Sequence, residues 1–126
     1  MDRSSGILLP VSALPRPCGI GDLGADARDF IDFLAAAGQR YWQILPLNPP
    51  DGAHSPYLSA STFAGSTDLL SPEPFLARGA LTADEVRAID WGEDPMRVDY
   101  DRVHAGRTAL WDAAFARERD TAAPAL

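Results

Sequence analysis

Two short apolar runs, separated by a segment with helical periodicity, open the chain. Residues 7–11 read Ile-Leu-Leu-Pro-Val and residues 41–47 read Tyr-Trp-Gln-Ile-Leu-Pro-Leu. Neither run alternates apolar with polar positions, which predicts buried strands of a parallel sheet. Between them, a helix is predicted over residues 25–37, ended by Gly38. Its apolar face is formed by Ala27, Phe30, Ile31 and Leu34. Strand, helix and strand within about 40 residues form a βαβ unit with a right-handed crossover.

The second half of the chain predicts helices only. Residues 71–79 form a short helical turn that begins at a Ser-Pro pair and ends at a glycine. Thr82 and Glu85 have the spacing of a capping box, which predicts a helix over residues 83–89. A last helix is predicted over residues 101–119.

Three features qualify this outline. Gly106 lies inside the last predicted helix and lowers its intrinsic propensity by roughly 1 kcal/mol relative to Ala. The Ala- and Pro-rich tail from residue 120 is expected to fray. Two parallel strands without a third leave apolar edges exposed, so we expect the chain to be a piece of a larger α/β fold.

A polar, aromatic loop over residues 48–65 follows the second predicted strand, where parallel α/β folds place their ligands. Tyr57, Ser55 and His54, set beside a proline, suit a neutral, hydroxyl-rich ligand such as a sugar, which needs a flat apolar surface and a few hydrogen bonds. The residue types alone leave other interpretations open: Tyr57 fits a loop anchor equally well, and Ser55 fits a local turn bond. No Asp is placed to orient His54, which argues against a hydrolase triad.

Composition and charge exclude several classes of function. The 126 residues carry a formal net charge of -7, and their scattered arginines form no basic stripe for nucleic acid. Cys18 is the single cysteine, so an internal disulfide is impossible and a cytoplasmic location is expected. The apolar run at residues 7–11 is too short for a membrane span or a signal peptide. His54 and His104 lack metal-ligand spacing, so neither a metal nor another cofactor is expected.

Residues 19–24 read Gly-Ile-Gly-Asp-Leu-Gly and match the glycine fingerprint of dinucleotide-binding folds. The first of these glycines lies eight residues past Val11, whereas a phosphate-binding turn should follow its strand closely. The acidic residue that binds the ribose should end the second strand, yet the first carboxylate there is Asp51. We therefore interpret the segment as a glycine-rich entry into the first helix.

Several short motifs occur together in a specific order. They are Gly6-Ile7-Leu8-Leu9-Pro10, Leu14-Pro15, the segment 19–24, the run 41–47, Ser55-Pro56-Tyr57, Phe63-Ala64-Gly65 and Val98-Asp99-Tyr100. In order and approximate spacing they resemble the amino-terminal part of the amylomaltases, the 4-α-glucanotransferases also called disproportionating enzymes. The resemblance covers nearly the whole chain.

The resemblance implies a (β/α)8 TIM barrel of the α-amylase type, with the two predicted strands as its first two. Such barrels need about 250 residues, so the chain would hold only the amino-terminal portion. Residues 1–65 would form the first βαβ unit and the substrate loop. Residues 66–126 would begin a mainly helical inserted region.

The resemblance also implies the chemistry. Family members transfer an α-1,4-glucan segment to an acceptor with retention of configuration, using a carboxylate nucleophile and a second carboxyl roughly 5 Å away. Those carboxylates come from later strands, so no catalytic residue is assigned in this chain, and the chain alone is expected to be inactive. Maltooligosaccharides are the implied partners. A non-catalytic glucan-binding or interaction module is the alternative.

What carries over by resemblance is substrate binding. Tyr57 matches the family tyrosine that packs beside the sugar near the cleavage point, and Ser55 matches a serine that contacts the glucan. Two positions depart from the family pattern. His54 stands where a small or acidic residue is common, and Cys18 stands where a bulkier residue is common.

Overall fold

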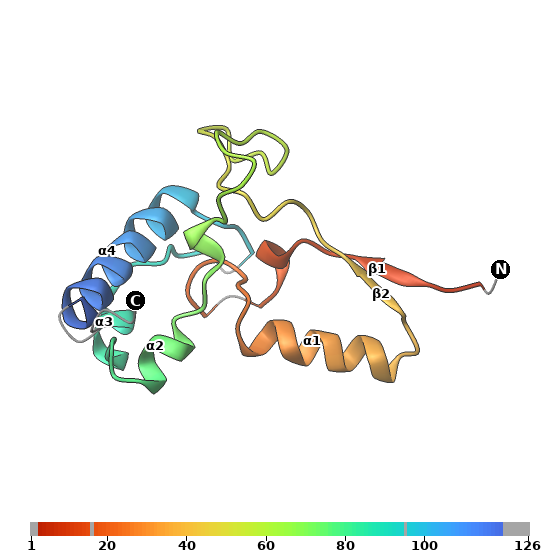
Figure 1. Ribbon diagram of the computed structural model, residues 1–126, viewed down its shortest axis with the longest axis horizontal. Helices are drawn as coiled ribbons and strands as arrows, with labels where there is room; N and C mark the ends of the chain where they lie inside the picture. Colours follow the sequence, from red (N-terminus) through yellow and green to blue (C-terminus); the bar gives the residue numbers. More distant parts are fainter. Residues whose placement is uncertain (1–2, 16, 95, 120–126) are drawn as a thin grey trace, which may run out of the picture.

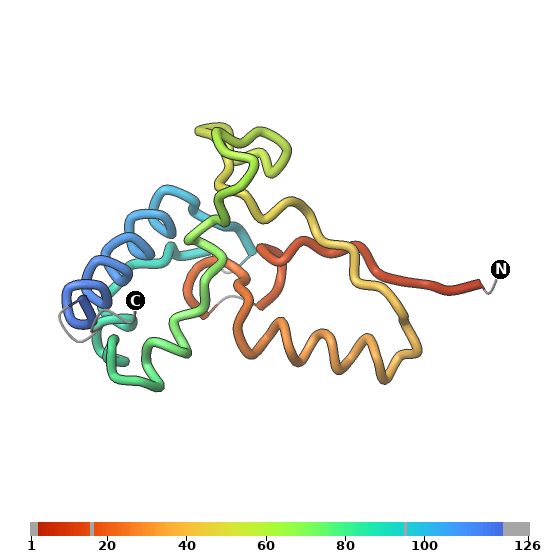
Figure 2. Tube along the Cα trace, viewed as in Figure 1, coloured from red at the N-terminus to blue at the C-terminus, as the bar shows by residue number. Residues whose placement is uncertain are grey.

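The computed structural model describes residues 3–15, 17–94 and 96–119. The molecule is elongated, with a two-stranded sheet and helix α1 (Ala25–Ala36) at one end (Figure 1). Helices α2 (Glu73–Ala77), α3 (Ala83–Ala88) and α4 (Tyr100–Glu118) gather at the other end. A long loop rises from the junction between the two ends, and the chain trace in Figure 2 follows it from β2 to the helices. The tail from residue 120, which was expected to fray, lies outside the described residues.

Strands β1 (Gly6–Leu8) and β2 (Tyr41–Gln43) pair in parallel across α1, which confirms the predicted βαβ unit. Both strands are shorter than predicted, because each apolar run contains a proline that cannot donate a hydrogen bond to the ladder. After Pro10 the chain turns into a single 3-10 turn, Val11–Ala13.

The expectation that these strands are buried is wrong for this chain. Tyr41 is 64% exposed and Leu8 is 57% exposed. On α1, Ile31 and Phe33 also face outward. The physical reason is that one helix covers only part of a two-stranded sheet, and the described residues supply no further strand or helix on its other side. The apolar surface that the sequence pattern assigned to a core therefore meets solvent.

The first of two small cores lies where the sheet meets α1. Val11, Leu14 and Ala27 are its buried residues, with Phe30 and Trp42 packed against them. The Trp42 indole N–H donates to the carbonyl of Leu9 at 2.8 Å, and its ring meets that of Phe30 edge-on at 5.1 Å. The second core is formed by Ala80, Leu81, Leu110 and Ala114 between the three later helices.

The later helices begin and end within two residues of their predicted bounds. The capping box is confirmed: the Thr82 hydroxyl accepts from the Glu85 amide, and the Glu85 carboxylate accepts from the Thr82 amide. Glu85 also pairs with Arg117 of α4, and Arg117 together with Thr82 lowers the pKa of the Glu85 carboxyl to about 2. Local signals therefore define this helix, and one long-range ion pair attaches it to α4.

Gly106 shows where packing overrides propensity. A Cβ atom added there would lie 2.5 Å from the Cγ2 of Ile89 and 2.9 Å from the Trp91 ring. The glycine lets α4 approach this neighbouring segment closely. The lower helix propensity of glycine is therefore offset here by close packing that an Ala side chain would obstruct.

A buried ion pair, which the sequence did not reveal, joins the glycine-rich segment to α4. Arg107 is 0% exposed, and its Nη2 donates to Asp22 Oδ2 at 2.9 Å. The same guanidinium donates to the carbonyl of Leu70 and lies 5.6 Å from the centre of the Trp91 ring. Asp22 in turn accepts the amide of Gly24 at 2.9 Å. This pair ties the two ends of the molecule together.

Candidate functional site at the end of strand two

The loop that follows β2 is closed at its base by hydrogen bonds. The Asn48 side-chain amide donates to the carbonyls of Ser61 at 3.0 Å and Ala64 at 3.1 Å. The amide of Ser66 donates to the carbonyl of Leu47 at 2.7 Å. The two arms of the loop are therefore held together where they leave the body of the molecule.

The tip of the loop is a compact turn of its own. The amide of Asp51 donates to the carbonyl of Leu58 at 2.8 Å, which closes an eight-residue turn. Inside the turn, the His54 amide donates to the carbonyl of Asp51 at 2.9 Å, and the Leu58 amide donates to the carbonyl of Ser55 at 3.1 Å. The backbone of the tip is thus defined by its own hydrogen bonds.

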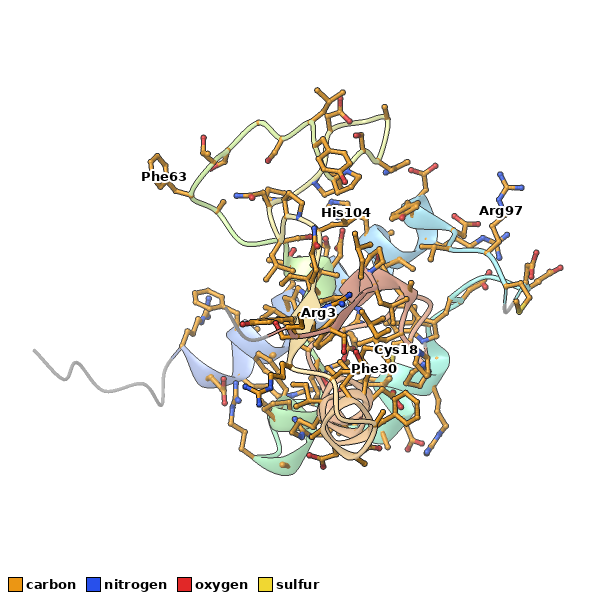
Figure 3. The ribbon with its side chains drawn as sticks, turned by 90° about the vertical axis from the view of Figure 1, so that its right-hand side faces the viewer. Arg3, Cys18, Phe30, Phe63, Arg97 and His104 are labelled. Atoms are coloured by element: carbon orange, nitrogen blue, oxygen red, sulfur yellow. The ribbon has the colours of Figure 1, made fainter. Side chains whose placement is uncertain are left out.

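Both sequence-predicted site residues lie in this tip. The side chain of Tyr57 extends into solvent, and the residue is 72% exposed. The Ser55 hydroxyl accepts the amide of Tyr57 at 3.4 Å, as the local-turn interpretation expected. A hydroxyl that accepts in this way still has its own hydrogen to donate. The tip therefore presents a flat ring and a hydroxyl donor two residues apart, with Phe63 projecting from the other arm (Figure 3).

Beneath the loop lies a cavity of about 230 Å³. It is lined by residues 10–12 and 45–48, by Asp68, and by His54 and Tyr100. Ser55 and Tyr57 do not line it, although their neighbours His54 and Pro56 do.

Two contacts around this cavity escaped the sequence analysis. The His54 ring stacks on the ring of Tyr100, the first residue of α4, with centroids 4.5 Å apart and planes 9° apart. On the next turn, His104 Nδ1 lies 3.2 Å from Asp68 Oδ1, a pair that becomes ionic when the imidazole is protonated (Figure 3). No sequence motif links the two residues of either pair, because only the fold brings them together. His104 and Asp68 lie 36 positions apart, and His54 and Tyr100 lie further apart still.

The glycine fingerprint is explained by packing. A Cβ on Gly21 would lie 2.2 Å from the carbonyl oxygen of Val11, and a Cβ on Gly24 would lie 2.5 Å from Ser71 Oγ. Gly19 has φ +76°, a conformation that favours glycine. The glycines are therefore needed for close approach to the chain's own atoms, as expected for an entry into α1.

The described residues offer few other groups of chemical interest besides this loop. Within residues 3–15, 17–94 and 96–119, no three His, Cys, Asp or Glu side chains form a group that could hold a metal ion. Cys18 is buried, and burial raises the pKa of its thiol. None of the described helices is both long enough and apolar enough to cross a bilayer.

The parallel βαβ unit, with a polar loop after its second strand, defines an α/β protein, a class in which ligands bind at the carboxyl ends of the strands. The chain belongs to the family of the 4-alpha-glucanotransferases, glycoside hydrolase family 77, which it matches over residues 9–125. This membership confirms the resemblance seen in the sequence.

Individual relatives give the same result. The chain is 42% identical over 115 residues to the 4-alpha-glucanotransferase of Streptococcus pneumoniae (strain TIGR4), covering 91% of the chain and 23% of that protein. It is 42% identical over 124 residues to the enzyme of Thermus thermophilus, covering 98% of the chain and 24% of that protein. The solved amylomaltase from Streptococcus agalactiae, in complex with acarbose, superposes with a TM-score of 0.90 at 35% identity, over 94% of the chain and 24% of that structure.

These relatives establish the fold of the chain as the opening portion of the amylomaltase TIM barrel, with β1 and β2 as its first two strands. The chain spans about a quarter of their length. We assign no catalytic role to Asp51 or Asp68, because a carboxylate near the loop is not by itself evidence of catalysis.

Proposed function

We propose that the chain supplies the strand-two substrate loop of a 4-α-glucanotransferase that moves α-1,4-glucan segments between maltooligosaccharides with retention of configuration. The observation that carries the proposal is the family match over residues 9–125, combined with a loop tip that exposes Tyr57 and holds the half-buried Ser55 beside it. The S. agalactiae relative was solved in complex with acarbose, which supports a glucan as the occupant here.

In this proposal the tip binds and orients the glucan. The Tyr57 ring offers the flat apolar surface on which a glucose ring packs, and the Ser55 hydroxyl donates to a sugar oxygen. Retaining transfer needs two carboxyl groups about 5 Å apart, and we place both outside these 126 residues. A tyrosine lying over the sugar also excludes water from that face, which favours an acceptor sugar over hydrolysis.

Two parts of the chain would share this task. We assign residues 1–65 to the first βαβ unit with the substrate loop, and residues 66–126 to the start of a helical region inserted into the barrel. The exposed apolar residues of β1, β2 and α1 support a longer protein, because further barrel elements would cover them. We further propose a cytoplasmic enzyme, on the strength of a single, buried cysteine.

The alternative is a glucan-binding module without catalysis. The exposed strand residues Leu8 and Tyr41 favour the transferase, since an independent module should cover them. Reading the coding sequence downstream of Leu126 separates the two. An in-frame barrel with paired acidic residues at later strand ends supports the transferase, and a stop codon there supports the module.

The direct test is transfer from maltotriose by the complete enzyme. Tyr57→Ala should lower kcat/KM at least tenfold, about 1.4 kcal/mol of transition-state stabilisation. Tyr57→Phe keeps the ring and should retain most of the activity. Leu58→Ala, at an exposed neighbour in the same tip, is the matched control. Unchanged kinetics for Tyr57→Ala would remove Tyr57 from the site, and a wild-type enzyme without transfer would refute the proposed function.

A further inference from the structure

His54 holds an unfavourable backbone conformation directly before the proposed substrate residues. Its φ of 57° makes it the one non-glycine residue with positive φ in the part of the chain that the structure describes. Such a conformation costs roughly 1–2 kcal/mol for an ordinary residue, although histidine, asparagine and aspartate adopt it more readily than most. Strain of this kind persists only where the surroundings hold the residue in place.

Contacts on both sides of His54 hold it. Its amide donates to the carbonyl of Asp51 at 2.9 Å, inside the turn. Its ring, on the other side, lies nearly parallel to the ring of Tyr100, with centroids 4.5 Å apart. The left-handed backbone thus belongs to a tip whose histidine side chain reaches across to α4.

Tyr100 is a fixed platform for this contact. It is the first residue of α4, whose first turn is capped by the side chain of Asp99. Further along the helix, Arg107 is wholly buried in its ion pair, and the Trp111 indole donates to the carbonyl of Thr67 at 3.1 Å. A ring stacked on Tyr100 is therefore attached to the body of the molecule.

We propose that His54 is a positioning residue: by stacking on Tyr100 it fixes the loop tip so that Ser55 and Tyr57 meet the glucan already ordered. This inference rests on the proposed function. The hydrogen bonds inside the tip define its shape, and those of Asn48 close its base, but the His54 ring fixes the tip relative to α4. Without the stack, a glucan would have to order the tip on binding, and the free energy of that ordering would weaken its affinity.

The test compares variants of the complete enzyme in maltotriose transfer. His54→Asn removes the ring but keeps a residue that tolerates positive φ. Tyr100→Leu removes the other ring without altering the loop, and Tyr100→Phe keeps the ring as the conservative control. We expect His54→Asn and Tyr100→Leu each to raise KM about fivefold with kcat within about twofold of wild type, since ordering affects ground-state and transition-state binding equally.

The remaining expectations separate positioning from general destabilisation. Tyr100→Phe should match wild type, and the double variant His54→Asn/Tyr100→Leu should raise KM no more than either single variant, because both remove one shared contact. The thermal midpoints of unfolding of these variants should not correlate with their KM values. An unchanged KM for His54→Asn, or a Tyr100→Leu variant that behaves like wild type, would overturn the inference. If Tyr57→Ala abolishes transfer while His54→Asn is silent, the proposed function stands and the positioning role falls. A wild-type enzyme without transfer would overturn both.

Discussion

The buried ion pair between Asp22 and Arg107 allows a stability prediction with a magnitude. Arg107 is 0% exposed, and besides Asp22 its guanidinium donates to the carbonyl of Leu70, while its Nε has no hydrogen-bond partner. Asp22→Ala leaves this charge buried without a carboxylate. Removing one partner of a buried pair costs about 3–5 kcal/mol, because an uncompensated charge remains.

The reverse change should be milder. Arg107→Met leaves Asp22, which is 12% exposed and still accepts the Gly24 amide at 2.9 Å, so its charge keeps a partner and some access to water. The double variant Asp22→Ala/Arg107→Met removes both charges and fills part of the site with an apolar side chain. It should be more stable than Asp22→Ala alone, since replacing both partners of a buried pair by apolar groups is often neutral or stabilising.

Native-state hydrogen exchange of the α4 amides measures these effects locally. A loss of about 3 kcal/mol corresponds to a fall in protection on the order of 100-fold for Asp22→Ala. The double variant should recover part of that protection. If the losses of the two single variants simply add in the double variant, the two side chains do not interact energetically and the reasoning is refuted.

Two further predictions concern packing and pH. Gly24→Ala places a Cβ 2.5 Å from Ser71 Oγ and should lower the free energy of unfolding by about 1–3 kcal/mol. Gly52→Ala, with open space around its Cβ, should leave the free energy of unfolding nearly unchanged. Urea denaturation measures both effects, and equal effects would contradict the packing argument. Because Arg117, together with the backbone and hydroxyl of Thr82, lowers the folded-state pKa of Glu85 from 4.5 to about 2, the stabilisation from these contacts is present above pH 4.5 and is lost as the pH falls toward 2. The thermal midpoint of Glu85→Gln should therefore lie below that of wild type at pH 6 and approach it near pH 2, and a difference independent of pH would contradict this.

The parts of the fold that the sequence predicted are those specified by neighbouring residues. The capping box at Thr82 and the stop at Gly38, which adopts φ +71°, depend on contacts a few positions apart. The parallel pairing followed from two apolar runs around one helix, and the match of the motifs to a family added the barrel. Local rules thus recovered the order and type of the strands and α-helices, but not the two 3-10 turns, Val11–Ala13 and Thr67–Leu69.

What the sequence could not predict depends on distant partners. Arg107 and Asp22 lie 85 positions apart, and no local pattern marks an arginine on a helix as wholly buried. Burial of β1 and β2 was expected because apolar runs indicate a core, but burial depends on neighbours that the described residues do not include. The stacking of His54 on Tyr100 has the same origin: the sequence shows two rings, and only the fold brings them to 4.5 Å.

The glycine segment shows how one pattern can satisfy two different physical demands. In a dinucleotide-binding fold the glycines let a pyrophosphate approach the first turn of the helix, where backbone amides and the helix dipole attract an anion. In this chain that anion is a side chain: the amide of Ala25, the first residue of α1, donates to Glu73 Oε1 at 3.2 Å, and Glu73 also pairs with Arg28 at 3.0 Å. The space that a Cβ on Gly24 would occupy is bounded by Ser71 and Asp22. The first turn of α1 still attracts negative charge, and Glu73 supplies that charge from within the chain. The glycine-rich residues 19–24 serve packing between the two ends of the molecule.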